Sequence, residues 1–210
     1  MKYTFVGDIH GKPEIVEQAL QSEGQVIFVG DFLDSFDRSI ENQIYALTLA
    51  LDAVDKGKAR AIFGNHELSY LMPTQHRCSG WRAITETRVV EMKERMFKTM
   101  VPFVKLPEHF IVTHAGIHKD VLPHLDELEF ANVDSPLHNI GWARGGRSRA
   151  GGIFWCDFNN EFIPIPGVNQ IFGHTAYGGR NGIRTMHTED SLNYCIDCLD
   201  HKVEFLKLEL

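Results

Sequence analysis

The sequence predicts an α/β protein in which helices pack against a sheet of mainly parallel strands. Over residues 1–64 of the 210-residue chain, short apolar runs typical of β-strands alternate with segments of helical periodicity. This alternation is the pattern of parallel βαβ units. In each case a polar cluster follows directly on the end of the strand. Open α/β sheets bind ligands at that edge, so the pattern also predicts where a site lies.

Three strands and two helices are expected in this first part. The segment from Ser39 to Lys56 has apolar residues at helical spacing, and Ser39 is a residue type favoured at a helix N-cap. Each strand ends at a glycine, where the backbone can turn sharply. In order, the expected elements are the strand Lys2–Val6, the helix Pro13–Ser22, the strand Gln25–Val29, the helix Ser39–Lys56 and the strand Lys58–Phe63.

The rest of the chain is expected to continue the same domain. We find no linker or repeat, and 210 residues suit one domain, residues 1–210, with a real core. The expected elements are a solvent-facing helix Trp81–Lys98, the strand His109–Thr113, a mobile glycine-rich loop Arg144–Gly152, a β-hairpin of Ile153–Phe158 with Glu161–Ile165, the strand Gln170–Phe172, and a C-terminal hairpin of Leu192–Asp197 with Lys202–Leu210.

Composition and charge exclude several classes of function. The net charge is -7 at pH 7, so no basic field attracts nucleic acid, and no nucleic-acid partner is expected. The first residues lead straight into a strand, without the charged and apolar regions of a signal peptide. No apolar stretch approaches the ~20 residues that span a bilayer. We therefore expect a cytoplasmic protein with no membrane partner.

Two of the four cysteines form a Cys-x-x-Cys motif. Cys195 and Cys198, followed by His201, allow a structural zinc site. No fourth ligand is evident, and the same residues fit the C-terminal hairpin. The hairpin is the preferred interpretation, with reduced cysteines as in the cytosol.

Five short polar motifs occur in order along the chain, and four of them immediately follow an apolar run. Any one motif could have a purely structural role, as turn residues or as a buried histidine whose hydrogen bonds are satisfied. That explanation would have to hold for all five motifs, each in the same strand-then-polar context. Asp8 and His10 are two residues apart, so an extended segment would point both to one side. The motifs are Gly7-Asp8-Ile9-His10-Gly11, Gly30-Asp31-Phe32-Leu33-Asp34, Gly64-Asn65-His66-Glu67, His114-Ala115-Gly116 and Gly173-His174.

Together these motifs resemble the calcineurin-like metallophosphoesterase family, in particular its PPP-type serine/threonine phosphatase branch and the small bacterial and phage members. The resemblance spans nearly the whole chain. It implies a sandwich of two mixed β-sheets flanked by helices, in the order α/β/β/α, and two divalent metal ions. Manganese is expected, with iron or zinc as alternatives, because oxygen and imidazole ligands suit these metals. The implied ligands are Asp8, His10 and Asp31 for the first ion, and Asp31, Asn65, His114 and His174 for the second.

The resemblance also implies a mechanism. Two ions ~3.5–4 Å apart would clamp the phosphoryl group and activate a bridging hydroxide for in-line attack, without a phospho-enzyme intermediate. His66, next to a ligand, would protonate the leaving alkoxide as general acid. Asp34 would orient His66 and stabilise its charge.

Two positions depart from wider family patterns. The last motif continues to Ala176, which cannot ligate, whereas diesterase and nuclease members carry a second histidine there. This favours the phosphomonoesterase branch. Ser35 stands where PPP members carry an arginine that clamps the substrate phosphate.

Other arginines are therefore candidates for phosphate binding, because a planar guanidinium suits bidentate recognition. Arg144, in Trp142-Ala143-Arg144-Gly145, is the first choice, followed by Arg147. Arg38 could curl back toward the metals, and Arg180 is a weaker candidate. Each could instead be an ordinary surface or loop arginine. The remaining histidines fall in no motif and are expected at the surface or in packing: His76, His109, His118, His124, His138, His187 and His201.

The function expected from these residues is metal-dependent hydrolysis of phosphomonoesters, with a phosphorylated protein or a small phosphoester as the partner. Phosphoserine and phosphothreonine proteins are the first choice of substrate. A symmetrical dinucleoside polyphosphate hydrolase, or another nucleotide phosphoesterase, shares the motifs and is the alternative. A non-catalytic metal-binding module is a third possibility, although decay would be expected to strike the ligands or His66, and all are present.

Overall fold

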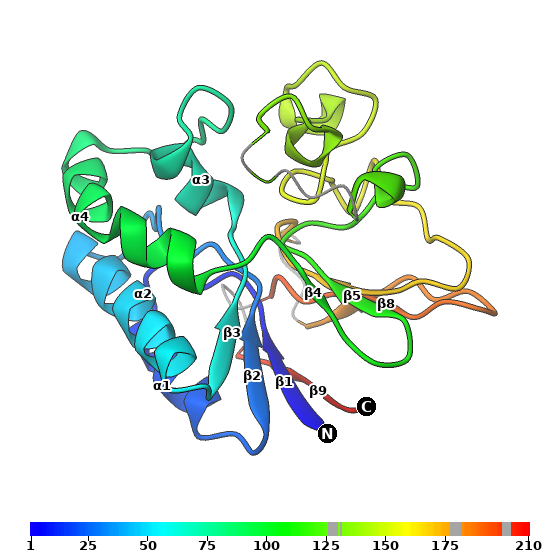
Figure 1. The fold of residues 1–210 in the computed structure, drawn as a ribbon, viewed down its shortest axis with the longest axis horizontal. Helices are drawn as coiled ribbons and strands as arrows, with labels where there is room; N and C mark the ends of the chain where they lie inside the picture. Colours follow the sequence, from blue (N-terminus) through cyan, green and yellow to red (C-terminus); the bar gives the residue numbers. More distant parts are fainter. Residues whose placement is uncertain (126–129, 131, 177–181, 199–202) are drawn as a thin grey trace.

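Two β-sheets lie face to face, with helices over the outer face of the first (Figure 1). The computed structural model describes residues 1–125, 130, 132–176, 182–198 and 203–210. The first sheet has the order β3-β2-β1-β9, in which β1 is parallel to β2, β2 is parallel to β3, and β9 is antiparallel to β1. Its strands are β1 (Lys2–Val6), β2 (Gln25–Phe28), β3 (Ala59–Ala61) and β9 (Leu206–Glu209).

The second sheet is also mixed, with the order β4-β5-β6-β8-β7. Its central strands β5, β6 and β8 are parallel, and its two edge strands are antiparallel to their neighbours. A buried apolar cluster that includes Phe5 and Ile27 of the first sheet and Val112 and Ile171 of the second joins the two sheets. The strands are β4 (Val104–Lys105), β5 (Phe110–Val112), β6 (Asn169–Phe172), β7 (Arg184–Thr185) and β8 (Asn193–Cys195).

Three helices form the outer layer on the first sheet, and a fourth starts at the site. The helix α2 begins after Ser39, whose hydroxyl accepts a hydrogen bond from the backbone N–H of Asn42 at 3.2 Å, as predicted for an N-cap. The helix α4 was expected to face solvent, but its Val89 and Met96 are buried in the main core. The helices are α1 (Pro13–Leu20), α2 (Ile40–Asp55), α3 (Asn65–Leu71) and α4 (Ala83–Thr99). The fold class predicted from the sequence is confirmed.

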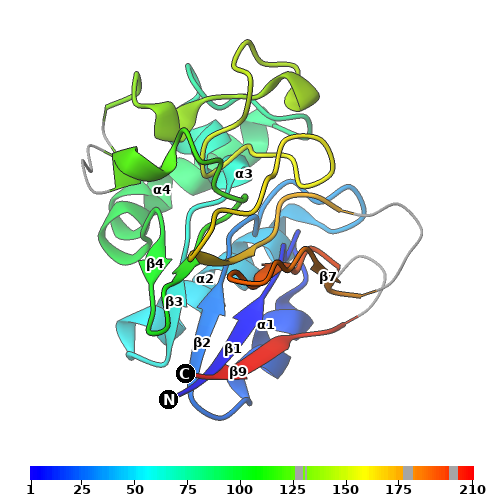
Figure 2. The same cartoon turned by 90° about the vertical axis from the view of Figure 1, so that its right-hand side faces the viewer.

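The predicted C-terminal hairpin is wrong. Its two strands belong to different sheets: β8 pairs with β6 and β7, whereas β9 pairs with β1 and brings the two termini together (Figure 2). In β9, Leu206 and Leu208 pack against the cluster between the sheets. The alternating apolar residues that suggested a hairpin therefore belong to a strand that pairs with β1. All four cysteines are free. His201 lies outside the described residues, and within the described part no group of three potential metal ligands includes a cysteine.

The predicted hairpin over residues 153–165 is also wrong, because this segment is a series of turns and irregular backbone. Its backbone N–H groups bond to side chains or to carbonyl oxygens within local turns, not to a partner strand. The Glu161 carboxylate accepts from the N–H groups of Gly151 and Asp157, and the Asp157 carboxylate accepts from those of Asn159 and Asn160. The segment covers the outer face of the second sheet in place of an α-helix, through an aromatic cluster of Phe158, Phe162 and Phe172.

The glycine-rich stretch Arg144–Gly152 is irregular, as expected, and follows a short 3-10 helix (Trp142–Arg144). Within the described ranges, no helix has the length and apolar character needed to cross a bilayer.

Candidate metal centre and active site

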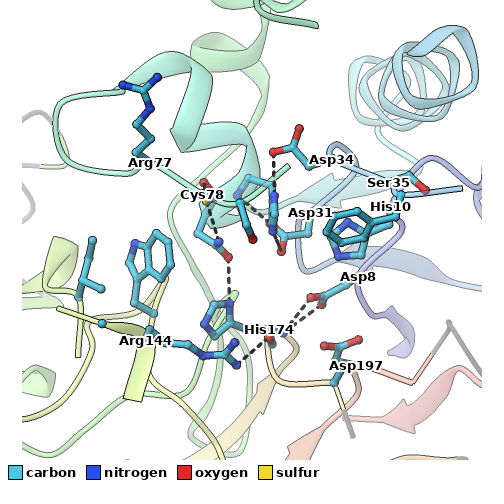
Figure 3. A pocket seen from close by; sticks show the side chains of 18 of the residues that line it. Asp8, His10, Asp31, Asp34, Ser35, Arg77, Cys78, Arg144, His174 and Asp197 are labelled. Atoms are coloured by element: carbon cyan, nitrogen blue, oxygen red, sulfur yellow. Dashed lines mark hydrogen bonds and ion pairs between the residues drawn. The ribbon is translucent and has the colours of Figure 1, made fainter. Parts of the chain in front are cut away.

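A pocket of about 880 Å³ lies where strands of both sheets end (Figure 3). Each sheet contributes side chains just beyond the carboxyl ends of its parallel strands, which is where α/β sheets bind ligands. Beyond β1, β2 and the end of β3 come Asp8, His10, Asp31 and Asn65; beyond β5, β6 and β8 come His114, His174 and Asp197. All of these line the pocket except His114, which is fully buried just behind it.

The backbone at the site is held in a conformation that non-glycine residues rarely adopt. The φ angles of His10, Asp31, Asp34 and His174 are 42°, 53°, 59° and 68°. Positive φ costs free energy and clusters at functional sites, where surrounding structure enforces it. Neighbouring glycines leave room for the acids: a Cβ on Gly173 would lie 2.0 Å from Asp8 Oδ1.

The predicted histidine ligands present their ring nitrogens to a shared space. His10 Nδ1 lies 2.8 Å from the carbonyl oxygen of Leu33, and His114 Nδ1 lies 2.8 Å from that of Val29. Each Nδ1–H therefore donates outward to the backbone, which leaves Nε2 as a lone-pair donor toward the pocket. This is the arrangement that fixes metal-ligating histidines in proteins.

Asp31 lies at the centre of the candidate ligands. Its carboxylate belongs to two groups in which every potential ligand atom lies within 4.8 Å of the others: one with His10 and His66, the other with His114 and His174. Burial opposes its ionisation, but the neighbouring His114 and His66 outweigh burial and hold the pKa of Asp31 well below its usual range. The buried carboxylates and imidazoles make a nitrogen and oxygen donor set that fits Mn, Fe or Zn.

The amide of Asn65 is oriented by a cysteine that sequence analysis did not single out. Its Nδ2 donates to Cys78 Sγ at 3.0 Å, and Cys78 donates back to the Asn65 carbonyl oxygen. The amide oxygen consequently faces His114 Nε2 at 2.7 Å and His174 Nδ1 at 2.9 Å. Asn65 thus presents oxygen, the atom that a metal needs, toward the two histidines.

His66 and Asp34 form the expected pair. His66 Nδ1 donates to Asp34 Oδ2 at 2.8 Å, and Nε2 faces Asp31 Oδ2 at 3.9 Å. Burial would lower the pKa of His66, but the charges of Asp31 and Asp34 outweigh it and raise this pKa to about 9. Tyr70 donates its hydroxyl to the other oxygen of Asp34. These neighbours therefore favour the protonated imidazole and hold it in one orientation.

Of the candidate arginines, the structure brings one to the pocket. Arg144 lines it and is held by Asp157, with 3.0 Å between Nη2 and Oδ2, and by the His174 carbonyl oxygen. Arg38 does not line the pocket, since its guanidinium pairs with Glu14 of α1 at 2.7 Å. A turn closed by the Ser35 hydroxyl, which accepts from the Arg38 N–H, directs the chain outward. Arg147 is exposed and does not line the pocket, and Arg180 lies outside the described residues.

Glu67 is the main site residue for which sequence analysis gave no role. Its fully buried carboxylate accepts backbone N–H groups from Asp31 (2.8 Å), Phe32 (2.8 Å), Leu33 (3.2 Å) and Gly64 (3.1 Å). It thereby joins the end of β2 to the start of α3. Its place in the Gly64-Asn65-His66-Glu67 motif was the only signal. Other pocket-lining residues missed include Lys12, Arg77, Cys78, Trp155 and Asp197; the Arg77 side chain points away from the candidate ligands (Figure 3).

A family model of calcineurin-like phosphoesterases matches residues 1–196. The chain belongs to this family. Members are metal-dependent phosphoesterases, so the family predicted from the five motifs is confirmed, and the family accounts for a metal centre at the strand ends.

Two similar proteins agree with this assignment. A probable serine/threonine-protein phosphatase of Encephalitozoon cuniculi is 24% identical over 206 residues, covering 86% of this chain. The chain spans 43% of that relative's length. A solved serine/threonine phosphatase from Saccharomyces cerevisiae, described as similar to human phosphatase PP5, has the same fold, with a TM-score of 0.56 and 16% identity. The alignment covers 94% of this chain and 67% of that one.

Proposed function

We propose that this protein is a two-metal phosphomonoesterase that acts on phosphoserine and phosphothreonine in proteins. The observation that carries the proposal is the convergence of six candidate ligands from both sheets beside His66, whose Nδ1 is engaged by Asp34. The ligands would be Asp8, His10, Asp31, Asn65, His114 and His174. Bound there, two divalent ions would polarise the phosphoryl oxygens and supply an activated water.

His66 would protonate the leaving group. Its Nδ1–H is engaged by Asp34, so the proton that can be transferred is on Nε2, which faces Asp31 and the pocket. The Asp34 carboxylate on Nδ1 favours the protonated imidazole and so helps to keep this proton on Nε2 until the alkoxide forms. Asp34, fixed by Tyr70, would hold the imidazole in position and stabilise its positive charge.

Arg144 would bind the oxygens of the substrate phosphate that the metal ions do not contact. It is anchored by Asp157 on one side, and its Nε has no hydrogen-bond partner among the residues described. A partly engaged guanidinium keeps planar donors for an anion. Ser35, in place of the family's usual arginine, leaves Arg144 as the predicted arginine that lines the pocket.

The choice of a protein substrate is supported by both similar proteins, which are described as serine/threonine phosphatases. Manganese is the proposed metal, and the cytoplasmic location stays a prediction. Protein stripped with a chelator and reloaded with Mn²⁺, Fe²⁺ or Zn²⁺ should hydrolyse p-nitrophenyl phosphate and phosphoserine peptides, with Mn²⁺ the most effective. A dinucleoside polyphosphate should be assayed beside them.

Each alternative predicts a different result in that assay. Exclusive cleavage of the dinucleotide would overturn the phosphoprotein assignment and favour a nucleotide phosphoesterase. Two bound ions without hydrolysis of any of these substrates would favour a non-catalytic module instead.

A further inference from the structure

Two buried histidines outside the candidate metal centre form a hydrogen-bond chain that ends at the pocket wall. His76 follows α3 and is 0% exposed, and His138 closes the 3-10 helix Pro136–His138 and is 5% exposed. His76 Nε2 lies 2.8 Å from His138 Nδ1. On its other side, His76 Nδ1 accepts from the indole N–H of Trp155 at 2.7 Å. Trp155 lines the pocket.

The chemistry of the groups fixes the direction of this chain. An indole nitrogen can only donate, so His76 Nδ1 must accept and its proton must be on Nε2. His76 Nε2–H then donates to His138 Nδ1, and His138 Nε2–H donates to the Phe130 carbonyl oxygen at 3.0 Å. One arrangement of protons satisfies every group, with both imidazoles neutral. The rings of His76 and Trp155 also stack, with 6.1 Å between their centroids and 8° between their planes.

The other side of the indole contacts His174. The two rings meet edge to face, with 5.8 Å between centroids and an angle of 79°. His174 differs from His10 and His114 in how it is held. Those two donate their outer nitrogen to a backbone carbonyl, whereas the buried Nε2 of His174 has no hydrogen-bond partner in the described part of the chain. Apart from the contact of its Nδ1 with the Asn65 amide oxygen at 2.9 Å, this ring is therefore oriented by packing.

We propose that His76 and His138 are positioning residues that fix the Trp155 indole against His174, and that this contact replaces the outer hydrogen bond that orients the other two histidine ligands. The indole orients His174 only if it is itself fixed, and its single donor is fixed by His76. His138 in turn holds His76 in the tautomer that accepts from Trp155. The inference rests on the proposed role of His174 as a metal ligand.

The test is metal binding, measured by calorimetric titration of the metal-free protein with Mn²⁺. His76→Leu removes both hydrogen bonds of the chain at this position, whereas His76→Gln keeps an acceptor and a donor. We expect His76→Leu to weaken the Mn²⁺ ion that His174 would hold, and so one of the two measured affinities, by about 10–100-fold, the usual effect of losing an outer partner of a ligand. His76→Gln should retain most of the affinity. The other Mn²⁺ ion, held without His174, should bind as in the parent protein.

Trp155→Phe keeps an aromatic ring but removes the N–H donor, and should also weaken one Mn²⁺ ion. Trp142→Phe is its matched control, because Trp142 likewise donates its indole N–H, to the Arg147 carbonyl oxygen at 3.0 Å, but is 67% exposed and outside the pocket. Urea unfolding of each metal-free variant shows whether it is folded before titration.

Three results would overturn the inference. The first is that His76→Leu and Trp155→Phe fold but bind both ions with unchanged affinity. The second is an equal loss of Mn²⁺ affinity in Trp142→Phe and Trp155→Phe, and the third is an equal loss of Mn²⁺ affinity in His76→Gln and His76→Leu. If the parent protein itself bound fewer than two Mn²⁺ ions, the proposed two-metal function would fail instead. The two failures are therefore distinguishable.

Discussion

His66 is held by a carboxylate on one ring nitrogen and faces the pocket with the other, as a proton donor to a leaving group must. Asn has similar polarity but no titratable proton, so His66→Asn should remove the acid and leave the candidate ligands in place. We expect kcat to fall by roughly 10²–10⁴-fold, the usual contribution of a general acid. Metal content, measured by elemental analysis, should be nearly retained.

His109→Asn is the matched control for this substitution. His109 is exposed, lies before β5 and has a φ of 58°, a conformation that Asn also adopts readily. Its replacement should leave kcat unchanged. An unchanged kcat in His66→Asn would remove His66 from the mechanism.

Asp31 is the carboxylate that both candidate ligand groups share. Asp31→Asn keeps the shape of the side chain and tolerates the φ of 53°, but it removes the negative charge that two cations would share. We expect both Mn²⁺ ions to bind at least ~10-fold more weakly, a loss that even an outer partner of a ligand can cause. Calorimetric titration would measure the two affinities separately.

Asp37→Asn is the control for a general loss of negative charge at the pocket. Asp37 lines the pocket rim, is exposed and bonds to the Ser35 hydroxyl, but it belongs to neither ligand group. Its substitution should change neither affinity much. If Asp31→Asn still bound two Mn²⁺ ions tightly, the role of Asp31 as a ligand shared by both ions would be refuted.

At the residue scale, the sequence predicted the candidate ligands that the structure brings together at the pocket, but not the side chains that orient them. Asp8 and His174 stand in recognisable motifs at the ends of strands. Cys78 orients Asn65 from a segment with no motif, and Asp197 reaches the pocket just beyond β8, a strand for which the wrong partner was predicted. Such contacts are set by tertiary packing, which leaves no periodic signal in the sequence.

At the element scale, Glu67 connects the end of β2 to the start of α3 through four backbone N–H groups. Glu67→Gln replaces one accepting oxygen with an amide that donates, so buried N–H groups lose their acceptor. We expect the free energy of unfolding to fall by about 2–3 kcal/mol, since one buried unsatisfied group costs ~1–3 kcal/mol. Burial, and then the charge of Asp31, raise the pKa of Glu67 to about 7, so urea unfolding should be measured at pH 8.

The control is Glu41→Gln. Glu41 is also an acid in the first turn of a helix, so it experiences the same helix dipole, but it is exposed. Its substitution should change stability by less than ~1 kcal/mol. Equal losses in the two variants would indicate that the helix dipole, and not the buried hydrogen bonds, determines the effect of Glu67.

Errors in element prediction arose where side chains replaced backbone pairing. The segment 153–165 has the composition of a hairpin, but three of its N–H groups bond to the Glu161 and Asp157 carboxylates, others bond to carbonyl oxygens in local turns, and no ladder forms. The helix α3 is only seven residues long and starts at the candidate ligand Asn65, so its periodicity is too short to recognise.

At the scale of the whole molecule, the opening βαβαβ unit was predictable because its contacts are local in sequence. The partners of β8 and β9 were not predictable in this way. The register of β9 pairs Lys2 with Glu209, residues from opposite ends of the chain. Alternation of apolar residues is the same whichever strand lies alongside, so it predicts a strand without naming its neighbour.

The buried histidine chain makes the stability of the whole molecule sensitive to acid. Burial, and then the nearby His138, lower the pKa of His76 to about 3, and burial lowers the pKa of His138 as well. An unfolded histidine binds its proton near pH 6.5. Between pH 6.5 and about 3, an unfolded chain therefore binds a proton at His76 that the folded protein does not, and stability decreases by ~1.4 kcal/mol for each unit by which the pH is lowered. The lowered pKa of His138 acts in the same direction.

His76→Gln should reduce the slope of the free energy of unfolding against pH by the contribution of one bound proton. Urea unfolding of the metal-free protein at pH 7, 6 and 5 measures the slope, and the difference between parent and variant cancels the contributions of Asp31, His66 and other groups common to both. His109→Asn, at an exposed histidine, should keep the parental slope. If His76→Gln also kept it, His76 would not be a neutral, buried group, and the direction assigned to the hydrogen-bond chain from Trp155 would be wrong, because a charged His76 has no lone pair to accept the indole N–H.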